Sequence, residues 1–523
     1  MTRAAILPGL LATGSGLLLL GWLDAAAWAK PIVLPGTQPG GGGVAIAKPT
    51  QCMLCHSKTP NGDADPYASW SSGMMAQSAR DPIFLLALDV ANKDIAGSGE
   101  YCIRCHVPRA WMGKRAIDGD IHAADEEDMN GVSCDVCHRA VDPLSPEALE
   151  YVSAAPTGYG NAMVVIDPRN VVRGPYVVDE GVMPHLPVKD AFPSTSEMCA
   201  QCHDVSNPAL ATDPMTQVPY AYGALQRTYS EWLASDNATL GSCQSCHMPT
   251  IHAEGQAARY QDTVHDHFVT HEGTGGSVWQ LGLTAAVWPT QVDHASVEKG
   301  QERSKALLTT AASLTATVKG SLVVVKVTNN TAHKLPTGFP DGRRVWVHVR
   351  FLNDAGKVIE EQGAYAPKPS TYNGVKVTVS DLIEPEKTRV YETRAGMSTA
   401  QAAKYGMPAG GSYHLNLNDT IIKDTRIPPK GATNAELQSH LAGSVGANYT
   451  DGQYWDEFAL KVPLGATKVE AELLYQGVTW DYAKFLMENS GDRELSEKVW
   501  TYWKESGGCA PDLIAATSAV IGR

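Results

Sequence analysis

Apolar and polar side chains alternate along several segments in the second half of the chain. Residues 345–351 place Val and Phe on one face and Trp, His and Arg on the other, which is the period of two that a half-buried strand requires. Residues 322–327 and 357–361 read as further strands, and residues 469–475 alternate again with two Glu on the outward face. From these segments we predict an antiparallel β-sandwich over residues 311–480.

The rest of the chain shows helical or irregular patterns. Apolar residues recur at helical spacing within residues 481–523, which predicts a C-terminal helical tail. Residues 30–50 are rich in Gly and Pro, so we expect a flexible linker there. Residues 51–310 show only short helical stretches, such as 81–96, between loops of variable length. The sequence therefore predicts an α+β protein, in which a mostly irregular and helical domain precedes the sandwich and the C-terminal helix.

A basic residue and a long apolar run open the chain. Arg3 precedes the apolar residues 4–23, and small residues frame Trp28. This order is typical of a secretory signal peptide, which we place at residues 1–29. An uncleaved anchor is the alternative, and the Gly and Pro residues inside the run weaken it. No later segment has about 18 consecutive apolar residues, so we expect no transmembrane helix in the mature chain. The export route leads to the periplasm, the cell surface or the extracellular space.

Ten of the 11 cysteines fall into five copies of the motif Cys-x-x-Cys-His. This is the attachment signature of c-type haem, in which two thiols bind the porphyrin and the imidazole becomes the proximal iron ligand. A redox dithiol needs no following His, and zinc sites rarely repeat this unit, so we predict five c-type haems, each with one iron. The attachment thiols are those of Cys52, Cys55, Cys102, Cys105, Cys134, Cys137, Cys199, Cys202, Cys243 and Cys246, and the proximal ligands are His56, His106, His138, His203 and His247. The remaining thiol, Cys509, is either free or paired with another chain.

Five six-coordinate irons would need five further ligands. The chain has 16 histidines, so those outside the motifs outnumber the irons. A surface or hydrogen-bonded role is the alternative for any one of them, and the demand of five irons weighs against it. His252 and His271 also follow the fifth motif. The preferred distal ligands, in order, are His185, His333, His267, His265 and His122.

Further sequence signals surround the motifs. They are Trp70-Ser-Ser-Gly-Met-Met-Ala76, Ala79-Arg-Asp-Pro82, Gly131–Arg139, Cys199–Pro208, Cys243–Pro249 and Ala332-His-Lys-Leu-Pro-Thr-Gly338. In these residues the chain resembles the multihaem c-type cytochromes related to the tetrahaem electron acceptor of ammonia oxidisers. The resemblance covers about residues 51–350 and implies a multihaem electron carrier, without selecting a donor or an acceptor.

One departure from those cytochromes concerns a distal ligand. Many of them carry Ser-x-His-Ala after the first motif, and the resemblance implies that this His binds an iron. Here the corresponding residues read Ser72-Gly-Met74-Met75-Ala. We hypothesise that Met74 or Met75 binds one iron, which would raise the potential of that haem above that of a bis-His neighbour. Core packing by methionine is the alternative.

The net charge of the chain and the expected coordination of the irons together limit the classes of function. The formal net charge of −14 argues against a nucleic-acid binder and favours a basic or neutral redox partner. An electron carrier needs saturated irons, whereas a haem enzyme needs an open one. Every motif keeps its His, so we predict an exported electron carrier acting between redox partner proteins, other haem proteins among them, with no catalytic residue assigned. The alternatives are an oxidoreductase that converts a small inorganic substrate at one open haem, and a self-assembling subunit of an extracellular haem filament.

Overall fold

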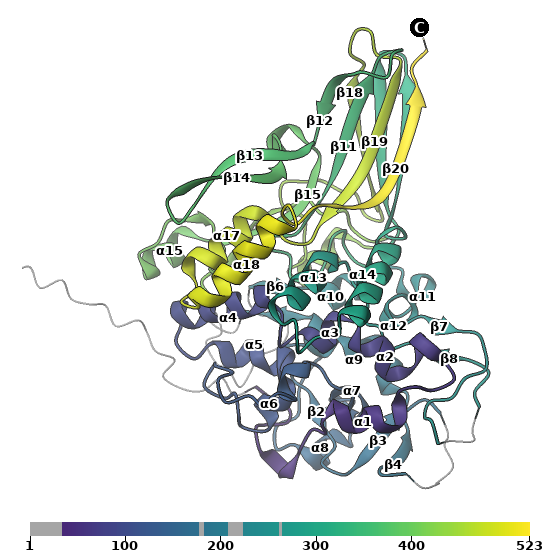
Figure 1. Cartoon of the computed structure of the whole chain (residues 1–523), viewed down its shortest axis with the longest axis vertical. Coiled ribbons are helices and arrows are strands. Elements are labelled where there is room, and N and C mark those ends of the chain that lie inside the picture. The colour runs from purple at the N-terminus through teal and green to yellow at the C-terminus, as the bar shows by residue number, and fades with distance from the viewer. Residues whose placement is uncertain (1–33, 177–182, 208–222, 261–263, 523) are drawn as a thin grey trace, which may run out of the picture.

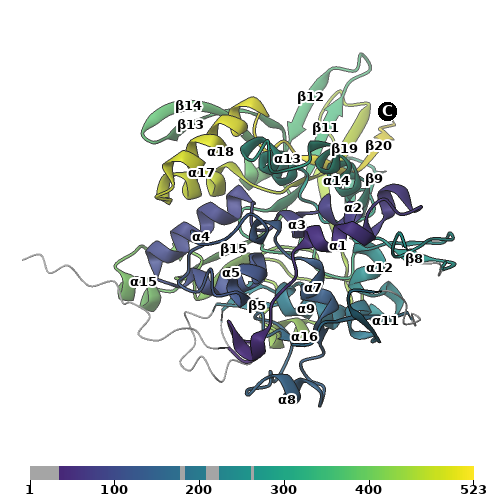
Figure 2. The same cartoon turned by 60° about the horizontal axis from the view of Figure 1, so that its bottom comes forward.

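The computed structural model describes residues 34–176, 183–207, 223–260 and 264–522 (Figure 1). The signal peptide expected at residues 1–29 lies outside the described residues. Helices dominate up to residue 308, and long strands dominate from residue 312 onward. In Figure 1 the long strands project as a blade from the helical part, and Figure 2 shows the same two parts from another side. The α+β class is therefore confirmed.

Short helices and two-stranded pairings make up the helical part, joined by irregular loops. Its helices are α1 (Pro49–His56), α2 (Pro66–Ser71), α3 (Met74–Gln77), α4 (Pro82–Asp94), α5 (Gly99–His106), α6 (Pro108–Met112), α7 (Cys134–His138), α8 (Ala148–Tyr151), α9 (Ser196–His203), α10 (Thr228–Leu233), α11 (Asn237–Leu240), α12 (Cys243–His247), α13 (Val278–Val287) and α14 (His294–Leu308). Its strands are β1 (Ala140–Val141), β2 (Val165–Ile166), β3 (Val171–Gly174), β4 (Leu186–Lys189), β5 (Val205–Ser206), β6 (Ala224–Gln226), β7 (Thr250–Ile251) and β8 (Phe268–Val269). Among the described residues, no helix combines the length and apolar composition needed to cross a bilayer.

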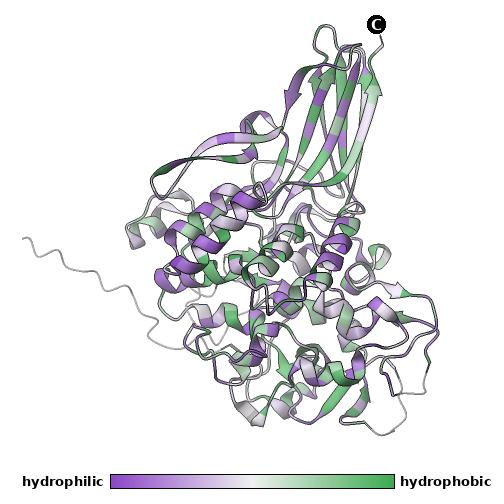
Figure 3. Cartoon of the chain, in the orientation of Figure 1, coloured by the Kyte–Doolittle hydropathy of each residue, from purple (hydrophilic) through white to green (hydrophobic). Residues whose placement is uncertain are grey.

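The β part contains two facing antiparallel sheets. Its strands are β9 (Ala312–Lys319), β10 (Leu322–Asn329), β11 (Arg344–Leu352), β12 (Val358–Gln362), β13 (Tyr365–Tyr372), β14 (Val375–Leu382), β15 (Val390–Met397), β16 (Gly410–Gly411), β17 (Thr420–Asp424), β18 (Trp455–Lys461), β19 (Lys468–Gln476) and β20 (Asp512–Val520). One sheet has the order β18-β10-β9. The other has the order β16-β15-β11-β19-β20, with β12 and β17 paired at its sides. The strands β13 and β14 pair with each other as a separate two-stranded sheet. The predicted strands coincide with β10, β11, β12 and β19, and Figure 3 shows apolar and polar residues interspersed along β11 and β19.

Inward-facing side chains fill the space between the two sheets. Val323, Val325, Val347 and Leu473 belong to one buried cluster, and each is at most 1% exposed. Burial of such aliphatic side chains contributes roughly 1.5–3 kcal/mol each. The apolar positions of the strands predicted from the sequence are thus the positions that form this core.

The end of the chain differs from the expected helical tail. After β19 the chain forms α17 (Trp480–Asn489) and α18 (Arg493–Glu505), and residues 512–520 then form β20, which pairs antiparallel with β19. β20 consists mostly of Ala, Thr and Ser, so its sequence lacks the apolar alternation that marks the other strands. The remaining helices of the β part are α15 (Thr399–Tyr405) and α16 (Asn434–Ser439).

Aromatic packing joins the helical part to α17 and α18. The ring of Trp503 contacts the rings of Trp279 and Trp480, each at a centroid distance of 5.3 Å. Cys509 lies in the same cluster and is 1% exposed, and burial raises the pKa of its thiol to about 12. A thiol so placed does not fit the pairing with another chain that the sequence left open.

Candidate haem sites

Each of the five motifs ends a short helix. The motif histidine is the last residue of α1, α5, α7, α9 and α12 in turn. Residues three and four apart lie on one face of a helix, so the helical turn places both thiols and the imidazole of a motif on the same side. This is the arrangement that one porphyrin edge and its iron require.

Three motif histidines face a second histidine ring from a distant segment. The ring centroids are 6.4 Å apart for His56 and His185, 5.9 Å for His138 and His271, and 6.3 Å for His247 and His333, with interplanar angles of 18°, 28° and 25°. Two imidazole nitrogens that each bind one metal ion at about 2 Å hold their ring centres about 6 Å apart. The spacing of all three pairs therefore fits one iron between each pair of rings.

Backbone carbonyls orient the proximal ring of each pair. Nδ1 of His56 lies 2.7 Å from the carbonyl oxygen of Ala257, and Nδ1 of His138 lies 2.7 Å from that of Arg173. His247 makes the same bond to the carbonyl of Thr274. Because a carbonyl only accepts, Nδ1 carries the proton and Nε2 is left with its lone pair for a metal.

Burial favours the neutral form of the distal rings. It lowers the pKa of His271 to about 3 and that of His333 to about 4, and it also lowers the pKa of His185. The neutral imidazole is the form that binds iron, so these three rings are suited to be ligands.

The other two motif histidines have different surroundings. The ring of His106 stacks on Phe84 at a centroid distance of 3.9 Å, and its Nδ1 is buried without a hydrogen-bond partner. Nδ1 of His203 lies 2.9 Å from the side-chain amide of Gln226. Within the described part of the chain, no histidine ring stands opposite either of them at the spacing of the three pairs. Burial lowers the pKa of both to about 4.

The structure brings only some of the expected distal ligands to a motif. His185 and His333 lie opposite motif histidines, and so does His271, which the sequence did not rank. His267 instead contacts the carboxylate of Asp266 at 2.6 Å. His265 stacks on Tyr176 at 4.2 Å, and the side chain of His122 is 93% exposed.

The two methionines of the Ser72–Ala76 segment differ in position. Met74 packs against the apolar cluster of α13 and α14 that contains Leu281 and Val297. Such packing is the alternative role considered for it. The side chain of Met75 lies against Gly273, two residues after His271.

Contacts between thiols show which motifs are neighbours. The thiols of Cys52 of motif one and Cys134 of motif three lie close enough to interact, which lowers the pKa of Cys52 and raises that of Cys134. The same kind of interaction relates motif four to motif five, through Cys199 and Cys243, and motif four to motif two, through Cys202 and Cys105. Cys137 of motif three interacts electrostatically with both cysteines of motif four. The motifs therefore follow the order one, three, four, five, with motif two beside motif four.

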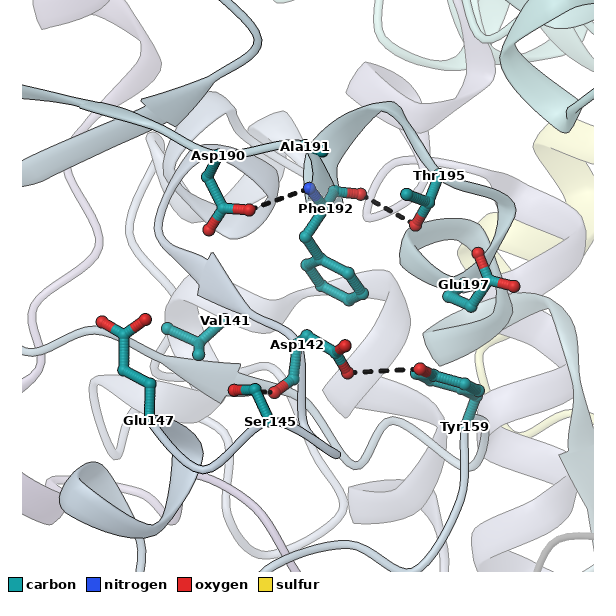
Figure 4. A pocket seen from close by; sticks show the side chains of 10 residues that line it. All are labelled: Val141, Asp142, Ser145, Glu147, Tyr159, Asp190, Ala191, Phe192, Thr195 and Glu197. Atoms are coloured by element: carbon teal, nitrogen blue, oxygen red, sulfur yellow. Dashed lines mark hydrogen bonds between the residues drawn. The ribbon is translucent and has the colours of Figure 1, made fainter.

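A separate cavity of about 450 Å³ lies in the helical part (Figure 4). Four carboxylates line it together with Phe192 and Tyr159. Burial and the neighbouring Asp142 raise the pKa of Tyr159 to about 12. Among the described residues, no group of three or more His, Cys, Asp or Glu is placed to hold a metal ion.

The fold and the motifs define an α+β protein whose helical part gathers five Cys-x-x-Cys-His helices beside a β-sandwich. Among solved structures, the chain is similar in fold to the penta-heme cytochrome c552 from Thermochromatium tepidum, with a TM-score of 0.52 and 18% sequence identity. The match covers 94% of this chain and 100% of that one. No family model and no curated protein matches the chain.

Proposed function

We propose that the chain is an exported c-type cytochrome that carries electrons through five covalently attached haems between redox partner proteins. The observation that carries this proposal is the set of three histidine pairs, each spaced for one iron. A protein of similar fold is itself a penta-heme cytochrome, which supports it. The leading segment, with the features of a signal peptide, supports residence in the periplasm or outside the cell.

The residues around the motifs fit the proposed cofactor. Leu54 lies between the two cysteines of motif one, and Leu186 directly follows His185. These two leucines are 64% and 62% exposed, although most large apolar side chains of the helical part are buried. A flat apolar macrocycle between His56 and His185 would pack against such side chains. Bound haem supplies a reversible one-electron couple, and two imidazole ligands saturate its iron.

The thiol contacts support a continuous route for electrons. The closeness of the thiols of neighbouring motifs brings the attachment points of successive haems together. The helices of motifs one and five mark the two ends of the main series, where Leu54 and Cys246 are exposed. We place the docking sites of donor and acceptor at these two ends.

The test is to remove the paired distal histidines one at a time. We expect five haems per chain by the pyridine haemochrome assay. In EPR of the oxidised holoprotein, His185→Ala, His271→Ala and His333→Ala should each convert one low-spin bis-histidine signal to another species. The matched controls are His122→Ala, His265→Ala and His267→Ala, which should leave the spectrum unchanged. Unaltered spectra in the first group, or a loss in the controls, would contradict the ligand assignment.

A second candidate function is favoured by His106 and His203, because no histidine ring stands opposite either of them within the described residues. An iron with only one histidine ligand can accept a small molecule. The positive charge of Arg343 acts on His203, lowering its pKa further, so an inorganic anion is the class of ligand that this neighbourhood favours. A high-spin EPR signal that changes on addition of nitrite or CO would support an oxidoreductase. Five low-spin haems that do not react with nitrite or CO would contradict the oxidoreductase and support the electron carrier.

A further inference from the structure

Four buried charged side chains surround the loop that carries His333. Nζ of Lys334 lies 2.9 Å from Oδ2 of Asp424, and Arg426 binds the same carboxylate at 2.9 and 2.6 Å. Nη1 of Arg426 also lies 2.9 Å from Oε1 of Glu231. The exposed fractions of these four side chains lie between 0% and 6%. Two cations and two anions thus form one neutral network without access to water.

Stability alone does not account for such a network. Each buried ion loses its hydration, and apolar side chains of similar volume often stabilise a fold as well or better. Once the network is present, however, every member depends on the others, because removal of one leaves an uncompensated buried charge. The network therefore specifies one arrangement of the segments that contribute to it.

Glu231 connects this network to the backbone beside His333. Its Oε2 accepts hydrogen bonds from the backbone N–H of Lys334 at 3.1 Å and from the hydroxyl of Thr337 at 2.6 Å. Arg426 approaches the same loop from the other side, with Nη1 3.3 Å from the carbonyl oxygen of Pro336. The residue directly after His333 is thereby fixed at both its backbone and its side chain.

The contributors come from both parts of the molecule. Glu231 belongs to α10, between motifs four and five, whereas Asp424 ends β17 and Arg426 follows it. The network therefore holds the loop of the β part at a set place relative to the helical part. That place puts the ring of His333 6.3 Å from the ring of His247.

We propose that Glu231 is a positioning residue for His333 and thereby sets the ligand geometry and the redox potential of the haem at motif five. This inference rests on the proposed function. It assigns Glu231 no contact with the cofactor. Outer partners of metal ligands fix the orientation of those ligands and tune the metal.

The experiment compares three variants of the holoprotein by EPR and by a redox titration that resolves the five haems. Glu231→Ala removes both hydrogen bonds to the loop, so the g-values and midpoint potential of one haem, the one that His333→Ala also affects, should shift. Glu231→Gln keeps an amide oxygen that can accept from Lys334 and Thr337 but loses the charge that faces Arg426, so its shift should lie between those of the wild type and Glu231→Ala. Thr337→Val removes a single hydrogen-bond donor and should shift the midpoint potential of the same haem in the same direction by a smaller amount. This variant keeps the test decisive if Glu231→Ala does not fold.

The control is Asp456→Ala, which removes a buried carboxylate of the β part from its ion pair with the half-exposed Arg389. Asp456 is 5% exposed and binds Arg389 and the hydroxyl of Tyr391. It should destabilise the protein and leave all haem signals in place. If Glu231→Ala and Thr337→Val behave like this control while His333→Ala moves one haem, the positioning role is wrong and the proposed function stands. If His333→Ala moves no haem, the ligand assignment itself is wrong.

Discussion

Asp341 is a buried carboxyl group whose ionisation should make stability depend on pH. Its side chain belongs to the loop before β11 and is 7% exposed. Its hydrogen bond from the backbone N–H of Ala395 is long, at 3.4 Å. Burial raises the pKa of Asp341 to about 6, although the positive charge of Arg394 opposes this. In turn, the Asp341 charge contributes to the raised pKa values of Tyr413 and Tyr482.

The sign and the size of the effect follow from linkage. Below about pH 4 the carboxyl is protonated in both the folded and the unfolded chain, so it has no effect. As the pH rises, the unfolded chain releases the proton first, and the folded state loses stability until the folded carboxyl also ionises near pH 6. A shift from 3.8 to about 6 corresponds to about 3 kcal/mol of unfolding free energy lost between pH 4 and pH 7.

The substitution Asp341→Asn should abolish this dependence. We expect the variant to match the wild type near pH 4 and to exceed it by up to about 3 kcal/mol at pH 7.5. Denaturant unfolding at a series of pH values, followed by tryptophan fluorescence, measures the difference. Asp354→Asn, at an exposed turn position, serves as the control and should give no such gap. A constant difference at all pH values, or a variant that is less stable at neutral pH, would refute the reasoning.

Three further predictions concern packing, a thiol and an ion pair. Gly300→Ala should destabilise the protein by about 1–2 kcal/mol in denaturant unfolding, because the added Cβ would lie 2.0 Å from the carbonyl oxygen of Ser72. Ala normally favours a helix over Gly, so a more stable variant would contradict this reasoning. Cys509 should be inert to a thiol reagent in the native holoprotein, and one thiol per chain should react after unfolding; labelling of the native protein would contradict its burial. Asp167→Asn should cost about 1–3 kcal/mol at pH 7, because the buried Arg173 loses one of its three carboxylate partners and keeps Glu147 and Asp190. Nearby guanidinium groups hold the pKa of Asp167 below its usual range despite its burial, so this loss should shrink in acid unfolding at pH 3 and below.

Local signals in the sequence were enough for the attachment motifs and for the main strands. A Cys-x-x-Cys-His unit is contiguous, and its helical turn aligns its own side chains. The alternation in residues 345–351 likewise reports which face of β11 is buried. β20 carries no such pattern, because its place depends on pairing with β19 and not on its own side chains.

The distal histidines depend on long-range packing that the sequence does not display. Of the four histidines within residues 252–271, which follow motif five, only His271 faces a motif histidine. The backbone N–H of His271 donates to the hydroxyl of Ser69 at 2.9 Å. A Cβ on Gly73 would lie 2.2 Å from the carbonyl oxygen of Glu272, so only Gly allows this close approach. The Ser69–Met75 segment thus has a structural role in placing His271. The sequence did not show this role, because the methionines of the segment suggested an iron ligand instead.

The β part therefore contributes a residue to the candidate haem site at motif five. His333 lies in the loop between β10 and β11, and a ring this far along the chain reaches His247 only when both parts are folded together. A neutral network of four buried charges gives little net stability, but it tolerates few alternative arrangements of that loop. A metal ligand on a loop requires a defined position more than it requires a large gain in stability. The burial of Glu231 and Arg426 is thus consistent with a site that needs one defined ligand geometry at the boundary between the two parts of the protein.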